Sequence, residues 1–284
     1  MMRSDRLHLF LLLLPGIGVL LATFGLPLFW AVVGAFGLGA DGPGFTLMPL
    51  SDIFAQAKYR KGLMMSLYYA IAPTMLTLFV AIPLALLLQK SFIGRKLLNG
   101  LYKLPLAVPA IVAAFLVLTL FEQGGFVDRL LMLGGWSIGK IVRDPFGIGV
   151  ILATLWKDVP FMTLIIAGAF GAIPSDTVSA ARSLGATRLR AFWAVQLPLA
   201  MPGITAATLL CFVKSLGNFA APSLLGPAYP LPLSILMYDS YREGDWMAIY
   251  AMGTVLILAA FVVLAAYYTL TAAAFGAGKA ANSR

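Results

Sequence analysis

The stretch SDTVSAARSLGATRLRAFWAVQLPLAMPGI, residues 175–204, has the most specific pattern in this chain. It contains four charged residues, lies between two long apolar runs, and has a Leu-Pro and a Pro-Gly step near its end. Ser175 follows Ile-Pro and can cap a short helix over 175–184. Gly185 can then turn the chain, and Thr187 can cap a second helix. We therefore predict two short helices joined at a glycine.

The second of these helices is predicted to be amphipathic. Its apolar side chains recur at helical spacing, whereas Arg188 and Arg190 point elsewhere, and Leu197-Pro198 is expected to end it. The apolar set is Leu189, Phe192, Trp193 and Leu197. Two interpretations of the pattern stay open. The helix pair can rest on the lipid surface, or it can be a docking element for a cytoplasmic partner.

The composition around this stretch is that of an integral membrane protein. Of the 284 residues 61% are hydrophobic and 11% are charged, whereas soluble domains carry about 25% charged residues. The net charge of +9 is expected to mark cytoplasmic loops and contacts with membrane lipid rather than nucleic acid. A single cysteine, Cys211, excludes an intramolecular disulfide and a cysteine metal cluster.

Six apolar segments are long enough to cross a membrane, which takes roughly 20 helical residues. The predicted fold class is all-α, a single polytopic domain over residues 1–284 with six transmembrane helices. These are expected over residues 9–36, 63–89, 104–121, 147–170, 200–225 and 247–272. The first segment resembles a signal peptide at its basic start, but no clear small-residue cleavage site follows, so we expect it to be retained.

The distribution of Lys and Arg predicts the orientation. With the N-terminus inside, eleven of these residues fall in cytoplasmic segments and seven in outer segments. Both termini are then cytoplasmic, and so is the 171–199 segment, which contains the opening stretch.

One apparent nucleotide motif is set aside. GGWSIGKI, residues 134–141, fits Gly-x-x-x-x-Gly-Lys, but Ile141 stands where a phosphate-binding loop needs Ser or Thr for magnesium. The motif is also predicted to lie on the outer face, where ATP is scarce. We therefore expect no ATP hydrolysis by this chain.

The 171–199 segment resembles the EAA loop of permease subunits of binding-protein-dependent ABC importers. The family pattern is Glu-Ala-Ala, three residues, Gly, nine residues, then Ile-x-Leu-Pro. This chain has Ser179-Ala180-Ala181, Gly185 and Val195-Gln196-Leu197-Pro198 at the same spacing. It departs from the pattern at Ser179, in place of Glu, and at Val195, in place of Ile. The flanking sequences 155–174 and 199–204 are also similar to the family.

The resemblance implies a type I ABC importer permease fold and a division of labour among subunits. Two copies of a separate ATP-binding subunit would hold ATP and magnesium, and this chain would bind no cofactor and catalyse no reaction. A sibling permease would complete a heterodimeric pore. A periplasmic or lipid-anchored solute-binding protein would deliver the substrate to outer segments 124–146 and 226–246. The location implied is the bacterial inner membrane.

The resemblance also implies roles for residues of the 171–199 segment. In the family this segment couples the ATPase to the spans. The residues expected to do so are Ser179, Ala180, Ala181, Gly185, Arg188, Arg190, Leu197 and Pro198. Phe192 and Trp193 would pack between the segment and the spans. Contact of the arginines with lipid headgroups stays open.

Charged and polar residues within the spans are candidates for a translocation path, because such residues are costly in lipid. Lys157 and Asp158 are adjacent near the start of the fourth span, where an interface or headgroup role is the alternative. Lys214 lies deeper in the fifth span, and Gly217, Asn218 and Phe219 follow it. This stretch is similar to polyamine, phosphonate and ferric-ion permeases, which often have an acid where Asn218 stands. Helix packing is the alternative for these four residues.

The substrate predicted from the resemblance is a polyamine, with phosphonate or ferric ion as alternatives. A secondary transporter would need carboxylates near the bilayer midplane, and none is clearly placed there. A membrane hydrolase would need a catalytic pair, and the single histidine, His8, is peripheral. Both classes are therefore disfavoured.

Overall fold

The computed structural model describes residues 12–38 and 44–281. Every regular element in these ranges is a helix, and six helices are long and apolar enough to cross a membrane. They are Leu12–Ala35, Ala57–Gln89, Ala110–Met132, Ile148–Gly171, Arg188–Leu216 and Trp246–Thr269. The predicted all-α, six-helix fold class is confirmed. His8 and the predicted start of the first span lie outside the described residues.

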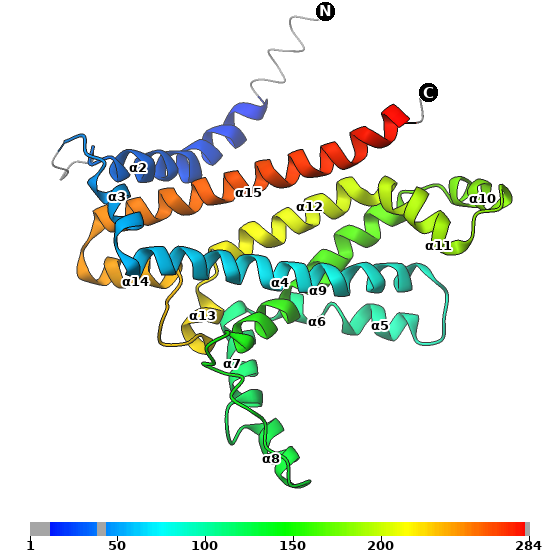
Figure 1. Ribbon diagram of the computed structural model, residues 1–284, viewed down its shortest axis with the longest axis horizontal. Helices are drawn as coiled ribbons and strands as arrows, with labels where there is room; N and C mark the ends of the chain where they lie inside the picture. Colours follow the sequence, from blue (N-terminus) through cyan, green and yellow to red (C-terminus); the bar gives the residue numbers. More distant parts are fainter. Residues whose placement is uncertain (1–11, 39–43, 282–284) are drawn as a thin grey trace, which may run out of the picture. The chain divides into compact units, whose positions relative to one another are not determined.

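The order of the helices along the chain can be followed in Figure 1. Residues 12–20 are helical. They are followed by η1 (Leu21–Gly25), α2 (Leu26–Ala35), α3 (Met48–Ala55), α4 (Ala57–Gln89), α5 (Arg95–Leu101), α6 (Leu104–Ala107), α7 (Ala110–Phe121) and α8 (Phe126–Met132). They are followed by α9 (Ile148–Gly171), α10 (Ser175–Ser183), α11 (Arg188–Ala191), η2 (Phe192–Gln196), α12 (Leu197–Leu216), α13 (Ala220–Leu225), α14 (Leu233–Glu243) and α15 (Trp246–Ala281). The elements η1 and η2 are π-helical turns.

These helices form two compact units. The first contains the described residues up to Arg60 together with Leu236–Leu258, and the second contains Lys61–Ile235 and the described residues from Ala259 onward. In the first unit α2 lies directly against α15. A side chain at Gly34 would overlap the ring of Tyr250, and the Thr254 hydroxyl lies 3.4 Å from the carbonyl oxygen of Ala31.

The second unit is organised around α9 and α12, which pack along each other. Their contact, together with α4, buries a cluster rich in small side chains. The cluster consists of Ala81, Ala85, Met162, Ile166, Phe170, Ala200, Ile204, Ala207 and Cys211. In lipid the hydrophobic effect does not drive helices together, so their association depends on close packing. Small residues permit that packing because they let the helix backbones approach closely. Gly203 shows how close the approach is, because an added Cβ there would collide with the Ala169 side chain.

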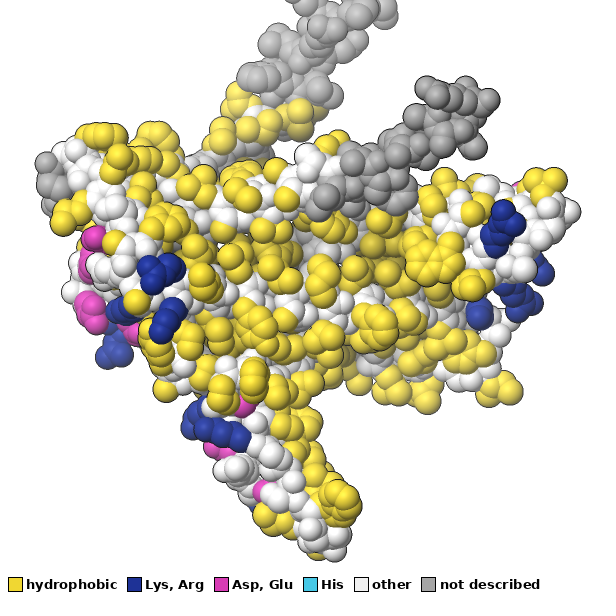
Figure 2. Space-filling model, in the orientation of Figure 1, with side chains coloured by type: hydrophobic (Ala, Val, Ile, Leu, Met, Phe, Trp, Pro, Cys, Tyr) yellow, Lys and Arg dark blue, Asp and Glu magenta, His cyan; other side chains and the backbone are white. Residues whose placement is uncertain are grey.

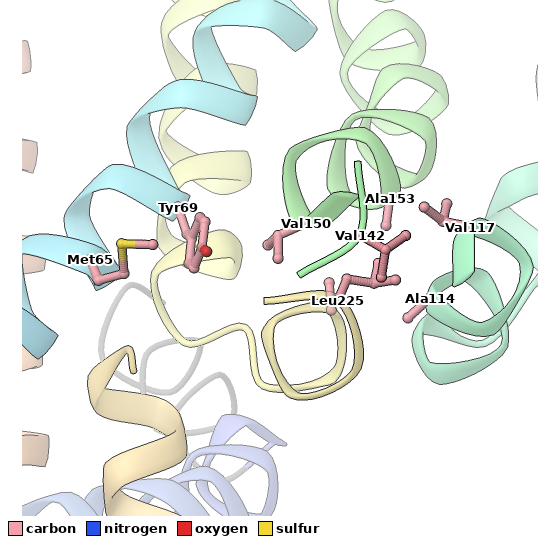
Figure 3. Packing of buried hydrophobic residues seen from close by; sticks show 9 residues of the cluster. Met65, Tyr69, Ala114, Val117, Val142, Val150, Ala153 and Leu225 are labelled. Atoms are coloured by element: carbon pink, nitrogen blue, oxygen red, sulfur yellow. The ribbon is translucent and has the colours of Figure 1, made fainter. Parts of the chain in front are cut away.

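A second cluster joins α4, α7, α9 and α13. Figure 3 shows Tyr69, Val150 and Leu225 converging from three of these helices, with the side chains of α7 on the other flank. Leu225 and Val150 are fully buried. The carbonyl of Leu225 also accepts a hydrogen bond from the Arg143 backbone N–H at 2.8 Å. The short helix α13 is therefore fixed between longer ones.

The predicted third span differs from the structure. It was expected as one helix over 104–121, but the chain breaks between α6 and α7. Val108 is extended, with φ −86° and ψ 126°, because the residue before a proline is disfavoured in the helical region. Pro109 then starts α7 as its N-cap.

The predicted end of the second short helix at Leu197-Pro198 is wrong. Residues Arg188–Leu216 form one helix, which contains α11, η2 and α12. The fifth span was expected over 200–225, but this helix begins twelve residues earlier and ends at Leu216. In the π-helical turn of η2, the Leu197 N–H reaches back to the Phe192 carbonyl. This wider turn comes just before Pro198, which has no N–H to give, so the helix continues through it.

Candidate functional site

The 171–199 segment contains the two predicted short helices, α10 and α11. Thr187 caps the second, because its side-chain oxygen accepts from the Arg190 N–H at 3.3 Å. The predicted cap at Ser175 is wrong. Pro174 holds the N-cap position, and the Ser175 hydroxyl lies 3.4 Å from a carboxylate oxygen of Asp176 instead. Ser175 is already the first helical residue, so its hydroxyl makes no capping bond.

Gly185 turns the chain between α10 and α11 with a φ of +88°. Its N–H bonds to the Arg182 carbonyl at 3.0 Å, and the Ala186 N–H bonds to the Ala181 carbonyl at 3.1 Å. These two bonds form a Schellman motif, which ends a helix at a left-handed residue. A Cβ at Gly185 would meet nothing within 4 Å. Glycine therefore fits this position because of its backbone conformation and not because of crowding.

The side chains of the segment divide between packing and exposure. Phe192 packs toward the α4–α9–α12 cluster, and its ring centroid is 6.2 Å from that of Phe170. Trp193 remains 61% exposed, although its ring contacts Phe192. Leu184, at the turn, is 89% exposed. The predicted packing role therefore suits Phe192 better than Trp193.

The remaining predicted coupling residues lie on or near the surface. Ser179, Ala180, Arg188 and Arg190 are exposed, and Ala181, Leu197 and Pro198 are half-buried. Figure 2 shows Lys and Arg side chains gathered over the α10–α11 end of this unit. Within the described part of the chain, no carboxylate forms an ion pair with Arg188 or Arg190. The segment thus presents positive charge and apolar side chains together.

Four of the six path residues predicted within the spans, Lys157, Asp158, Lys214 and Asn218, line a cavity of about 500 Å³. It lies between the α6–α7 break, the first half of α9, and the region where α12 gives way to α13. We call it the polar cavity. Its polar lining consists of Thr154, Lys157, Asp158, Lys214, Ser215 and Asn218.

Lys157 supports the break between α6 and α7. Its ammonium donates to the carbonyl oxygen of Pro105 at 2.7 Å and also to that of Val108. Pro109 cannot give an N–H to the Pro105 carbonyl four residues earlier. The Val108 N–H bonds to this carbonyl at 3.3 Å instead, and Lys157 adds a charged donor from α9. Irregular backbone is tolerated at membrane depth where it lines a cavity and its polar groups have partners.

Asp158 points to a different neighbour. Its carboxylate pairs with the ammonium of Lys214 on α12 and accepts from the Ser215 hydroxyl at 3.2 Å. The Asp158 side chain is 1% exposed, whereas that of Lys214 is 52% exposed. The pair therefore has a buried anionic end and a cationic end that is open to the cavity.

Asn218 is the fourth predicted path residue at the cavity. Its side-chain amide donates to the Thr154 hydroxyl at 3.3 Å, and its side-chain oxygen lies 3.4 Å from the Ala221 N–H. Gly217 and Phe219 do not line the cavity. Gly217 ends α12 and Phe219 precedes α13.

Sequence reasoning missed Thr154, Ser215 and the 106–110 stretch as cavity residues. Helical spacing could have found Thr154, because it lies three positions before Lys157 and four before Asp158 and is therefore a neighbour of each on the surface of α9. No comparable signal marked 106–110, since the break at Val108 was not expected. The GGWSIGKI stretch forms no phosphate loop, since irregular chain follows it and α9 begins only at Ile148.

Comparison with known proteins agrees with this architecture. Residues 78–275 match the family described as "Binding-protein-dependent transport system inner membrane component". The chain belongs to this family. Its fold is similar to that of a chain in a bacterial alginate ABC transporter, with a TM-score of 0.79, 18% identity and coverage of 96% of both chains. The fold is thus that of an ABC importer permease subunit.

The names of two relatives refer to substrates other than the predicted polyamine. One is the molybdenum transport system permease protein ModB of Mycobacterium tuberculosis, 32% identical over 209 residues, which are 71% of this chain and 76% of the relative. The other is a probable sulfate transport system permease protein of Marchantia polymorpha, 28% identical over 181 residues, 63% of this chain and 61% of the relative. The general resemblance to importer permeases is confirmed, and the narrower one to spermidine/putrescine permeases is not supported.

Proposed function

We propose that this importer permease carries a small oxyanion of the molybdate and sulfate class. The observation that carries the proposal is the charge of the polar cavity, where two lysine ammonium groups face one carboxylate. Lys157 donates to neutral carbonyls and, among the described residues, forms no salt bridge with a carboxylate. The names of the two relatives support the same class of substrate.

A cationic substrate fits the cavity less well. Asp158 is committed to Lys214 and Ser215 and is almost fully buried, so it offers no free carboxylate to a polyamine or ferric ion. Asn218 stands where related cation permeases often have an acid, and it is uncharged. A phosphonate carries the same kind of oxygen atoms as sulfate and stays within the proposed class.

The proposal includes ATP-binding subunits that dock on the 171–199 segment. Exposed Leu184, Leu189 and Trp193 give this surface apolar contact area, and the three arginines of the segment would attract acidic groups. A second permease subunit completes the pore, and a solute-binding protein delivers the anion from outside. The protein lies in the bacterial inner membrane with both termini in the cytoplasm.

Reconstitution tests this function directly. The chain is purified with its co-encoded ATPase, second permease and binding protein, and placed in proteoliposomes that contain ATP. Uptake of labelled molybdate, sulfate and spermidine is then measured. We expect ATP-dependent uptake of at least one oxyanion and none of spermidine. ATP-dependent spermidine uptake would overturn the substrate class.

The same preparation separates the importer from a secondary transporter. Vesicles without ATP, or with a non-hydrolysable analogue, should show no oxyanion accumulation. Uptake that persists without ATP and binding protein would contradict the importer function. Mass spectrometry of the purified complex identifies the second permease as a sibling or as another copy of this chain.

A further inference from the structure

We infer that the polar cavity contains an oxyanion-binding site in which Lys214 contacts the anion and Asp158 positions Lys214. This inference rests on the proposed function. It names Lys214 as a residue that the transported oxyanion contacts within the membrane.

The geometry of the pair leaves Lys214 able to bind a ligand. An ammonium has three N–H donors, and one of them is directed at Asp158. The side chain is still 52% exposed and lines the cavity. Asp158, in contrast, is 1% exposed and accepts from two donors. A ligand in the cavity therefore meets the ammonium and not the carboxylate.

The electrostatics of the cavity select an anion. Lys157 and Lys214 together exceed the charge of Asp158 by one positive unit. A net charge acts strongly here, because the surrounding membrane and protein have a low dielectric constant. The cavity volume of about 500 Å³ also leaves room for a tetrahedral oxyanion with part of its water.

Asp158 has a second effect on such a site. Its negative charge lies on the buried side of Lys214 and repels an anion that binds the ammonium from the cavity. A permease must release its substrate after each cycle, so tight binding would slow transport. The carboxylate therefore fixes the ammonium in place and at the same time keeps the anion affinity low.

Substitutions of Lys214 and of Asp158 should therefore change the sulfate affinity in opposite directions. K214M removes the contact and should weaken sulfate binding roughly tenfold. D158N removes the opposing charge but keeps a side-chain oxygen that can accept from the ammonium, so it should strengthen binding by a similar factor. If the pair only held α9 against α12, both variants would act in the same direction, because each leaves one charge without its partner.

The double variant D158N/K214M gives the sharpest test. It restores the net cavity charge to that of the wild type, one positive unit from Lys157, and it leaves no lone buried carboxylate. We expect its melting temperature to return toward the wild-type value while sulfate binding stays weak. K214R, which keeps the charge, should retain binding. Lys140→Met is the matched control, since it removes one exposed lysine outside the cavity.

The measurement is equilibrium binding of labelled sulfate to the complete transporter in nanodiscs without the binding protein, with molybdate and spermidine as competitors. Saturable binding that molybdate displaces and spermidine does not is expected. The inference is overturned if wild-type transporter shows no saturable binding, if K214M and D158N shift it in the same direction, or if the double variant recovers it. Any of these results can occur in a transporter that imports sulfate, so failure of this site is distinct from failure of the proposed function.

Discussion

The carboxylate of Asp158 on α9 pairs with the ammonium of Lys214 in the last turn of α12. The preceding residue, Lys157, reaches instead to the carbonyls at the α6–α7 break. Adjacent residues of a helix point about 100° apart, so this dipeptide can tie α9 to two different elements. Both ties end at the polar cavity, which makes α9 the element that holds its walls together.

Lys157→Met should loosen the break between α6 and α7. The substitution keeps much of the side-chain length but leaves the Pro105 and Val108 carbonyls without their charged donor, at a cost of about 2 kcal/mol. Thermal unfolding of the detergent-solubilised protein should show a lower midpoint. Lys96→Met, at an exposed lysine, should leave it unchanged. An equal midpoint for both variants would mean that the break is held by packing alone.

Gly185→Val should uncouple ATP hydrolysis from uptake without preventing membrane insertion. A left-handed conformation costs an ordinary residue roughly 1–2 kcal/mol, so the turn between α10 and α11 would change. We expect hydrolysis by the assembled transporter to continue while uptake falls. Gly171→Val is the control, since Gly171 is helical and equally open to an added Cβ. Gly185→Asn should be milder, because Asn tolerates this conformation.

Substitutions at Leu184 and at Phe192 should affect different properties of the protein. Leu184→Ser changes an exposed side chain, so the melting temperature should stay constant while the affinity for the ATP-binding subunit falls roughly tenfold. Phe192→Ala removes packing against Phe170 and should lower the melting temperature instead. Thermal scans and a pull-down of the ATP-binding subunit measure the two effects. Unchanged subunit affinity in Leu184→Ser would place the docking surface elsewhere.

Gly203→Val should force α9 and α12 apart. The added side chain would meet Ala169, and overpacking of this kind costs about 1–3 kcal/mol. Gly168→Val provides a matched control on α9, because nothing lies within 4 Å of its Cβ position. The thermal midpoint should fall for the first variant and hold for the second. If both behave alike, the close helix approach contributes little to stability.

Hydropathy was sufficient to predict the six helices, because the membrane requires long apolar segments whatever their packing. The residue types at positions 187 and 185 were sufficient to predict the helix cap at Thr187 and the turn at Gly185. It failed at Pro198, where a proline normally ends a helix. The π-helical turn at 192–196 removes that conflict, and its occurrence depends on how the neighbouring helices pack.

The polar cavity was predictable only in part. Lys157, Asp158, Lys214 and Asn218 were found because polar groups are rare within apolar segments. Their partners were not found, since Asp158 and Lys214 are separated by 56 positions in the sequence. Only the packing of α9 on α12 brings them together. The support that Lys157 gives to residues 105 and 108 could not be foreseen while the third span was expected to be unbroken.

The continuity of Arg188–Leu216 has a mechanical consequence. A helix of 29 residues is a rod about 43 Å long, with one end in the 171–199 segment and the other at Lys214 and the polar cavity. A tilt of roughly 5° about its middle would displace each end by about 2 Å, in opposite directions, from the same rise per residue. No hinge is needed along the way. If an ATP-binding subunit docks on the 171–199 segment as proposed, a displacement of that end of the helix would reach the Lys214 ammonium with its direction reversed.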